Sequence, residues 1–173
     1  MNEEAKNRFY GKYRGTVLNN VDPMLKGRIQ VQVPDVLQLS LSTWATPCVP
    51  MTGLQAGMFT VPPIGAAVWV EFERGDPNLP IWVGGFYGTP AEVPALAQAT
   101  PPGVQSIIFN TQLQNTLLIS DVPGPTGGFL LKTTTGAMIS INDTGILISN
   151  GKGATIAMTG PTVTINAGAL VVT

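Results

Sequence analysis

The chain has 173 residues and a formal net charge of −1, and only 11% of its residues are charged. That fraction is less than half of the roughly 25% found in ordinary soluble domains. A nearly neutral chain has no global field to attract nucleic acid or an anionic membrane. The sequence has no histidine and one cysteine, so it lacks the commonest general base and metal ligand and has no intrachain disulfide. We therefore expect no catalytic site, no metal site and no cofactor.

Residues 1–8 are polar and charged, without the apolar core of a signal peptide. No apolar run approaches the roughly 18 residues of a membrane span. We expect a flexible N-terminus and synthesis in the bacterial cytoplasm without a signal peptide. The cysteine, Cys48, lies among apolar residues and is expected to be a buried, inert thiol.

Residues 9–88 have the pattern of a compact β domain. Apolar residues alternate with polar ones in several short runs, and Pro or Gly interrupts the chain about every ten residues. Strands are predicted at 12–18, 27–33, 43–46, 66–72 and 79–87. Five short strands in about 80 residues suit a small closed barrel, of which the OB-fold is the common five-stranded version.

The composition changes at residues 89–103, where Pro and Ala dominate. A helix over 91–99 is conceivable, but Pro94 and the pair Pro101 and Pro102 favour an extended, polyproline-like linker. We therefore place the domain boundary in this linker.

Residues 104–173 contain a short unit that restarts at a glycine every 7 to 9 residues, at Gly136, Gly145, Gly153, Gly160 and Gly168. Apolar residues two positions apart follow these glycines and lie on one face of a strand. Strands are predicted at 116–120, 129–133, 137–141, 146–149, 155–158, 162–165 and 170–173. So short a unit cannot bury its apolar face alone.

Three chains wound around one axis would bury that face and remove the open sheet edges. The expected shaft is therefore an intertwined β-helix, a trimeric prism. A single-chain solenoid is the rival, but its coils are usually longer than this spacing. The residues predicted to form the trimer core of the shaft are Ile139, Ile141, Ile146, Ile148, Ile156, Met158, Val163 and Ile165.

Several motifs of the first domain resemble a known family. They are YRGTV at 13–17, KGRIQV at 26–31, WATP at 44–47, PPIGAAVWVEFERGDP at 62–77 and PIWVGGFY at 80–87. They are similar to the OB domain of phage baseplate spikes and of the VgrG proteins of type VI secretion. Repeats of the C-terminal part resemble the shaft that follows this domain. The resemblance implies an all-β homotrimeric spike at the centre of a contractile injection machine, with no enzymatic activity.

The resemblance also implies partners. About ten residues precede the barrel, so the baseplate hub is expected to be a separate protein, and Arg14, Lys26 and Arg28 are the candidates to face it. Without histidine the chain cannot build the His-x-His iron tip of some phage spikes. Its apolar end, Leu170, Val171, Val172 and Thr173, is instead expected to bind a PAAR-type tip protein. The spike would assemble into a phage tail or tail-like particle and meet the target membrane only during injection.

Other classes of function have weaker signals. Trp44, Trp69 and Trp82 could stack bases on an OB surface, which would make the chain a nucleic-acid-binding module with a β-rich oligomerisation tail. Few basic residues accompany them, so core or subunit-interface positions are preferred and no nucleic acid is expected. Glu71 and Glu73 could form a glycosidase pair, and the tail could bind envelope polysaccharide. The run at 150–155 departs from a phosphate loop because Gly153 replaces the required Ser or Thr.

Overall fold

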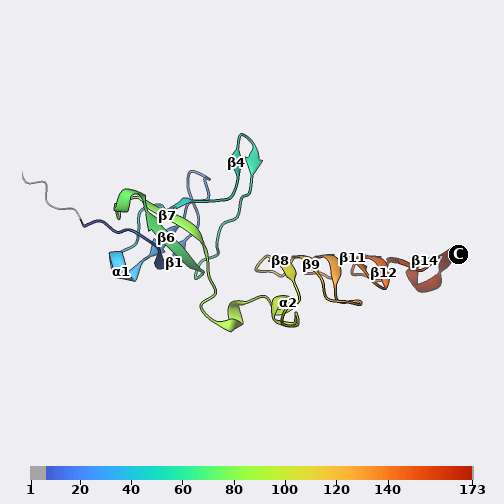
Figure 1. The fold of residues 1–173 in the computed structure, drawn as a ribbon. Helices are drawn as coiled ribbons and strands as arrows, with labels where there is room; N and C mark the ends of the chain where they lie inside the picture. Colours follow the sequence, from blue (N-terminus) through green and yellow to red (C-terminus); the bar gives the residue numbers. More distant parts are fainter. Residues whose placement is uncertain (1–6, 173) are drawn as a thin grey trace, which may run out of the picture. The chain divides into compact units, whose positions relative to one another are not determined.

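The computed structural model describes residues 7–172 and is nearly all β-structure, as predicted. The chain divides into two compact units, Met1–Pro90 and Ala91–Thr173 (Figure 1). None of the described helices is long and apolar enough to cross a membrane.

The first unit is built on a five-stranded sheet in the order β2-β1-β6-β7-β3. Its strands are β1 (Tyr13–Asn19), β2 (Gln30–Gln32), β3 (Thr46–Pro47), β6 (Ala67–Phe72) and β7 (Pro80–Gly85). All pairs are antiparallel except β3 with β7. The segment before β3 also bridges back to the other edge, because Ala45 N donates to Ile29 O at 2.7 Å. This double pairing brings the two sheet edges together, as an OB-type barrel requires.

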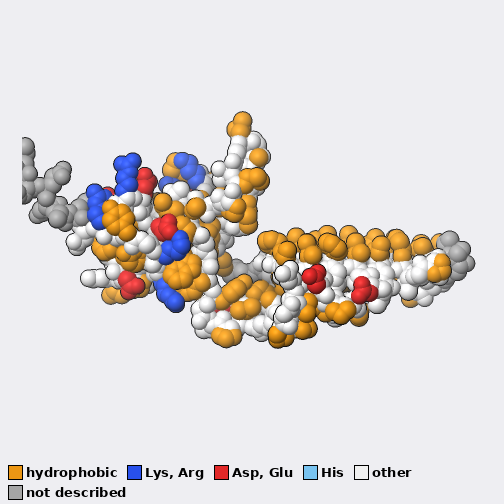
Figure 2. Space-filling model, viewed as in Figure 1, with side chains coloured by type: hydrophobic (Ala, Val, Ile, Leu, Met, Phe, Trp, Pro, Cys, Tyr) orange, Lys and Arg blue, Asp and Glu red, His pale blue; other side chains and the backbone are white. Residues whose placement is uncertain are grey.

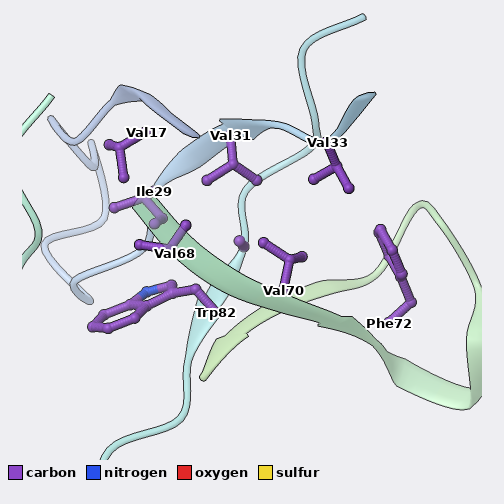
Figure 3. Close-up of a cluster of buried hydrophobic side chains, with 9 residues drawn as sticks. Val17, Ile29, Val31, Val33, Val68, Val70, Phe72 and Trp82 are labelled. Atoms are coloured by element: carbon purple, nitrogen blue, oxygen red, sulfur yellow. The ribbon is translucent and has the colours of Figure 1, made fainter. Parts of the chain in front are cut away.

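The barrel has a compact apolar core (Figure 3). Alternating residues of β1, β2 and β6 point inward, which is the period of two expected from their sequences. The core residues are Val17, Ile29, Val31, Val33, Ala45, Val68, Val70, Phe72 and Trp82. Gly15 is required where β1 passes this core, since a Cβ there would lie 2.9 Å from Cγ2 of Val70.

The first unit also contains elements other than the five predicted strands. A short helix α1 (Pro34–Leu37) follows β2, and a small hairpin pairs β4 (Thr52–Gly53) with β5 (Ala56–Gly57). A 3-10 turn, η1 (Glu73–Gly75), joins β6 to β7. Of the N-terminal segment predicted to be flexible, residues 1–6 lie outside the described part, while Arg8 Nη1 donates to Arg74 O at 3.2 Å.

The second unit begins with helical turns, so the prediction of an extended linker was wrong. These are η2 (Pro90–Glu92), which spans the boundary between the units, and α2 (Ala95–Gln98). Pro94 does not break α2 because it precedes the helix, where a proline costs no hydrogen bond. Leu96 of α2 lies beside Leu118 and Leu130 in a shallow groove of the sheet that follows.

That sheet has eight strands in sequential order, each antiparallel to the next. They are β8 (Ser106–Asn110), β9 (Thr116–Ser120), β10 (Gly128–Lys132), β11 (Met138–Asn142), β12 (Gly145–Ser149), β13 (Thr155–Thr159), β14 (Thr162–Ile165) and β15 (Leu170–Val172). A last 3-10 turn, η3 (Asn166–Gly168), precedes β15. Seven of these strands were predicted to within about one residue, and β8 was missed. We call residues 106–172 the shaft.

The glycine phasing has a backbone cause. All five glycines at which the unit restarts have positive φ, a conformation that other L-residues rarely adopt. Gly145 also lies against the next strand, since a Cβ on it would lie 2.0 Å from Met158 O. The glycines thus mark the places where the meander reverses or where two strand backbones meet closely.

Candidate oligomerisation and docking surfaces

One face of the shaft is apolar along its whole length. The register of each strand pair places apolar side chains opposite one another, as in Leu131 opposite Leu117 and Ile139. The result is two rows that cross all the strands. One row contains Ile107, Ile119, Phe129, Ile141, Ile146, Met158 and Val163; the other contains Phe109, Leu117, Leu131, Ile139, Ile148, Ile156, Ile165 and Leu170. We call these two rows the apolar face.

Within the described residues of the second unit, nothing covers the apolar face. Twelve of its fifteen side chains keep between 36% and 55% of their surface exposed, although they lie in regular strands, and Ile146, Val163 and Ile165 are half-buried. Figure 2 shows apolar side chains as a continuous ridge along the shaft. Soluble monomers rarely expose so extended an apolar patch, and such a patch marks an association surface.

The structure brings all eight residues predicted as the trimer core of the shaft onto this one face. Sequence reasoning missed seven further members, at the start of the shaft and at Leu170. Four of them, Leu117, Ile119, Phe129 and Leu131, lie in strands that were predicted, and their alternation could have identified them. Whether the face is the core of a trimer remains a prediction, since one chain is present.

The opposite face of the shaft is different in character. Its central row contains Ile108, Leu118, Leu130 and Leu147, with Ser140 between the last two, and the rows on either side are mostly polar. The polar side chains bond to each other, as in Ser106 Oγ to Ser120 Oγ at 2.7 Å and Asn142 Nδ2 donating to Ser140 Oγ at 3.0 Å. Several polar side chains of this face are thus paired within the chain, while Asn110 Oδ1 is buried without a hydrogen-bond partner.

The predicted tip site is only partly visible. Leu170 on β15 is about half exposed. The side chains of Val171 and Val172, and Thr173 as a whole, lie outside the described residues. The proposed binding of a tip protein at this end stays a prediction.

The three basic residues predicted to face a hub lie in different settings. Arg28 is engaged within the barrel, because its Nη2 donates to Asp22 Oδ1 at 2.6 Å and its guanidinium lies 5.4 Å from the ring centroid of Trp44. Arg14 on β1 is exposed and lies over the adjacent rings of Trp69 and Phe86. Lys26 is exposed. Arg14 and Lys26 are therefore the more available of the three.

Asp22 anchors the loop before β2. It is 6% exposed, and its carboxylate accepts hydrogen bonds from the backbone N–H groups of Met24, Lys26 and Arg28 as well as from the Arg28 side chain. The Arg28 guanidinium holds the pKa of the Asp22 carboxyl well below its usual range, against the opposing effect of desolvation, and the backbone N–H groups lower it further. The ionised carboxylate is thus a structural part of the barrel.

We expect Asp22→Asn to lower the urea midpoint of the barrel transition at pH 7, because an amide leaves Arg28 without its counter-charge. A carboxyl with a depressed folded-state pKa stabilises above its unfolded pKa of about 4, and that contribution fades as the pH falls below it. The difference in urea midpoint between wild type and Asp22→Asn should therefore become smaller from pH 7 to pH 3. A gap that widens on acidification would contradict this role. Exposed Asp35→Asn is the control, with no comparable change at either pH.

Glu71, considered as part of a glycosidase pair, and the run at 150–155, compared with a phosphate loop, have structural roles. Lys12 Nζ donates to Glu71 Oε1 on the barrel surface, so Glu71 is an ion-paired strand residue. Asn150 Oδ1 accepts from the N–H groups of Lys152 and Ala154, which makes this run a turn of the meander. Within residues 7–172 no three His, Cys, Asp or Glu side chains come together as a metal site would need. Cys48 was predicted to be buried, but it is exposed because it borders open grooves beside β7.

The three tryptophans divide between core and surface. Trp82 is buried, and its Nε1 donates to Gly27 O at 3.2 Å. Trp69 packs against Phe86 outside the barrel, with ring centroids 4.7 Å apart and ring planes tilted by 40°. Their joint face is already occupied by the Arg14 side chain, so stacking of a base there would require Arg14 to move.

An OB-type barrel followed by a sheet with an uncovered apolar face defines a β-rich protein that assembles through its C-terminal part. Residues 13–87 match the type VI secretion system/phage-baseplate injector OB domain, and residues 106–171 match the phage baseplate V C-terminal trimerisation domain. The chain belongs to the phage baseplate V family and is a VgrG-like baseplate spike protein. Both matches are to structural baseplate domains. A search of curated proteins gave no significant match.

Proposed function

We propose that three copies of the chain form the central spike of a contractile injection machine. The apolar face of the shaft carries the proposal, because it lies in the residues that match a trimerisation domain and is left exposed by the described residues of its own unit. Three such faces turned toward one axis would bury about fifteen apolar side chains per copy and leave the polar faces outside. At about 25 cal/mol per Å² of buried apolar surface, this burial would dominate the stability of the shaft.

The spike has two ends with different tasks in this proposal. The OB barrels dock on a separate hub protein, with Arg14 and Lys26 as the exposed charges available for that contact. The far end of the shaft carries a PAAR-type tip protein on its apolar residues, and the assembled rod punctures the target envelope. The match to an injector OB domain supports this arrangement. The particle would be a phage tail or a related injection particle.

Static light scattering of the purified chain at micromolar concentration tests the trimer. We expect three times the chain mass of 18.2 kDa, and a trimer band that survives SDS until the sample is heated. A monomer under these conditions would contradict the proposal. Fluorescence anisotropy with labelled single-stranded DNA provides the test of the alternative class, because tight, salt-sensitive binding would indicate a nucleic-acid-binding module.

A further inference from the structure

A hairpin arm projects from the barrel between β3 and β6 (Figure 1). We define the arm as residues 50–63. Its stem is the β4–β5 pair, extended by Met58 N donating to Met51 O at 3.0 Å. At its turn Gln55 adopts positive φ, and on one side of it Leu54 points into solvent. The arm is thus an ordered projection with a defined end.

The arm is apolar and uncovered. Leu54 is 97% exposed, Phe59 71% and Met51 62%, while the whole stretch 49–65 contains no charged residue. The apolar end of the projection is visible in Figure 2. A projection of this composition suits burial against another apolar surface.

The same barrel has an apolar groove beside the base of the arm. The groove has a volume of about 570 Å³ and is lined by Val49, Met58, Val61 and Trp82, with Cys48 at its border. No charged side chain lines it. Gly84 leaves this side of β7 open, since a Cβ on it would meet no atom within 4 Å. A second groove of similar size has Arg28 and Glu73 in its wall and suits an apolar side chain less well.

The end of the arm around Leu54 and the groove are two different surfaces of one chain, although the base of the arm lines one side of the groove through Met58 and Val61. A contact that joins different surfaces of identical subunits is head-to-tail, and it closes into a ring when the rotation between subunits is that of a threefold axis. The trimerisation domain ties three barrels together, which raises their local concentration to the millimolar range. Leu54 does not occupy the groove of its own chain, because it is almost fully exposed.

We propose that the arm of each copy lies in the groove of the next copy, with Leu54 as the apolar anchor. The three barrels then form a closed ring through a contact that is separate from that of the shaft. This inference rests on the proposed trimer. It assigns the arm to a second copy of the chain, and not to a hub protein or a nucleic acid.

The single native cysteine gives a direct test. In full-length Leu54→Cys, the new thiol of one copy would lie near Cys48 of the next. A disulfide forms only when the two Cα atoms come within about 7 Å, and a short bis-maleimide reaches pairs that are slightly farther apart. After oxidation or linker treatment of the trimer, we expect covalent dimers and trimers in most of the protein on heated, non-reducing gels. Reductant should remove the disulfide-linked species.

Two matched variants define the result. Leu39→Cys places a thiol at a site that is 90% exposed and does not line the groove, and it should give no ladder. Leu54→Cys combined with Cys48→Ser removes the acceptor and should also give none. A trimer by light scattering without Leu54→Cys cross-links by either reagent overturns the ring and leaves the spike proposal standing. Equal ladders in Leu39→Cys, or in the double variant, also overturn the ring, whereas a monomer overturns both proposals.

Discussion

Leu131→Asp is expected to abolish the trimer, whereas Lys132→Asp on the same strand should leave it intact. Leu131 lies in the apolar face between Leu117 and Ile139, and Lys132 points to the opposite face. In a trimer, three carboxylates would enter an apolar interior without a counter-charge. The desolvation cost is several kcal/mol for each ion, so about 10 kcal/mol or more is lost per trimer.

The measurement is the molar mass of each variant, determined by light scattering at pH 7 and a chain concentration of about ten micromolar. Lys132 is a matched control because it is the adjacent residue, is exposed and already carries a charge. Acidification should partly restore the Leu131→Asp trimer, since a protonated carboxyl is much less costly to bury. An intact Leu131→Asp trimer at pH 7 would show that the apolar face is not the subunit interface.

The apolar face was predictable from sequence because its signal is local. A residue's side of the sheet follows from the period of two, and the glycines and Asn-containing turns fix where each strand starts. Asn142, for example, ends β11 and its Oδ1 accepts from Thr144 N at 2.9 Å, so the turn is encoded by one side chain. The order of the meander follows, because each reversal is too short for anything but an adjacent antiparallel strand.

The strand β8 was missed because it does not alternate. Ile107, Ile108 and Phe109 form an uninterrupted apolar run, in which Ile107 and Phe109 belong to the apolar face and Ile108 pairs with buried Leu118. A strand that carries apolar residues on both faces loses the period of two. On the far side α2 packs near this row through Leu96, a tertiary contact that the linker composition did not indicate.

The surface of the barrel was the least predictable part. The arm has strands of two residues each, so neither alternation nor length marks it in the sequence. Arg28 was predicted to face a partner, but the structure places its charge against Asp22, six residues earlier in the chain. The exposure of Cys48 likewise depends on how β3 and the arm leave an open groove, which a local apolar sequence does not reveal.

A chain that ends at Pro90 should fold and be monomeric at micromolar concentration. The first unit has its own core of nine buried residues, and no member of that core lies beyond Trp82. Its urea transition should therefore remain cooperative. Without the shaft, the arm and groove of different barrels meet only at the bulk concentration, which is far below the millimolar effective concentration of a tethered trimer.

Sedimentation over a wide concentration range separates the contribution of the shaft from that of the arm. Residues 1–90 should sediment as a monomer near ten micromolar and begin to associate toward millimolar concentration, and Leu54→Ser should suppress that association. A barrel that remains a stable trimer at ten micromolar would contradict the view that the shaft supplies the trimer's stability. Association at high concentration that Leu54→Ser does not change would instead place the barrel contact away from the arm.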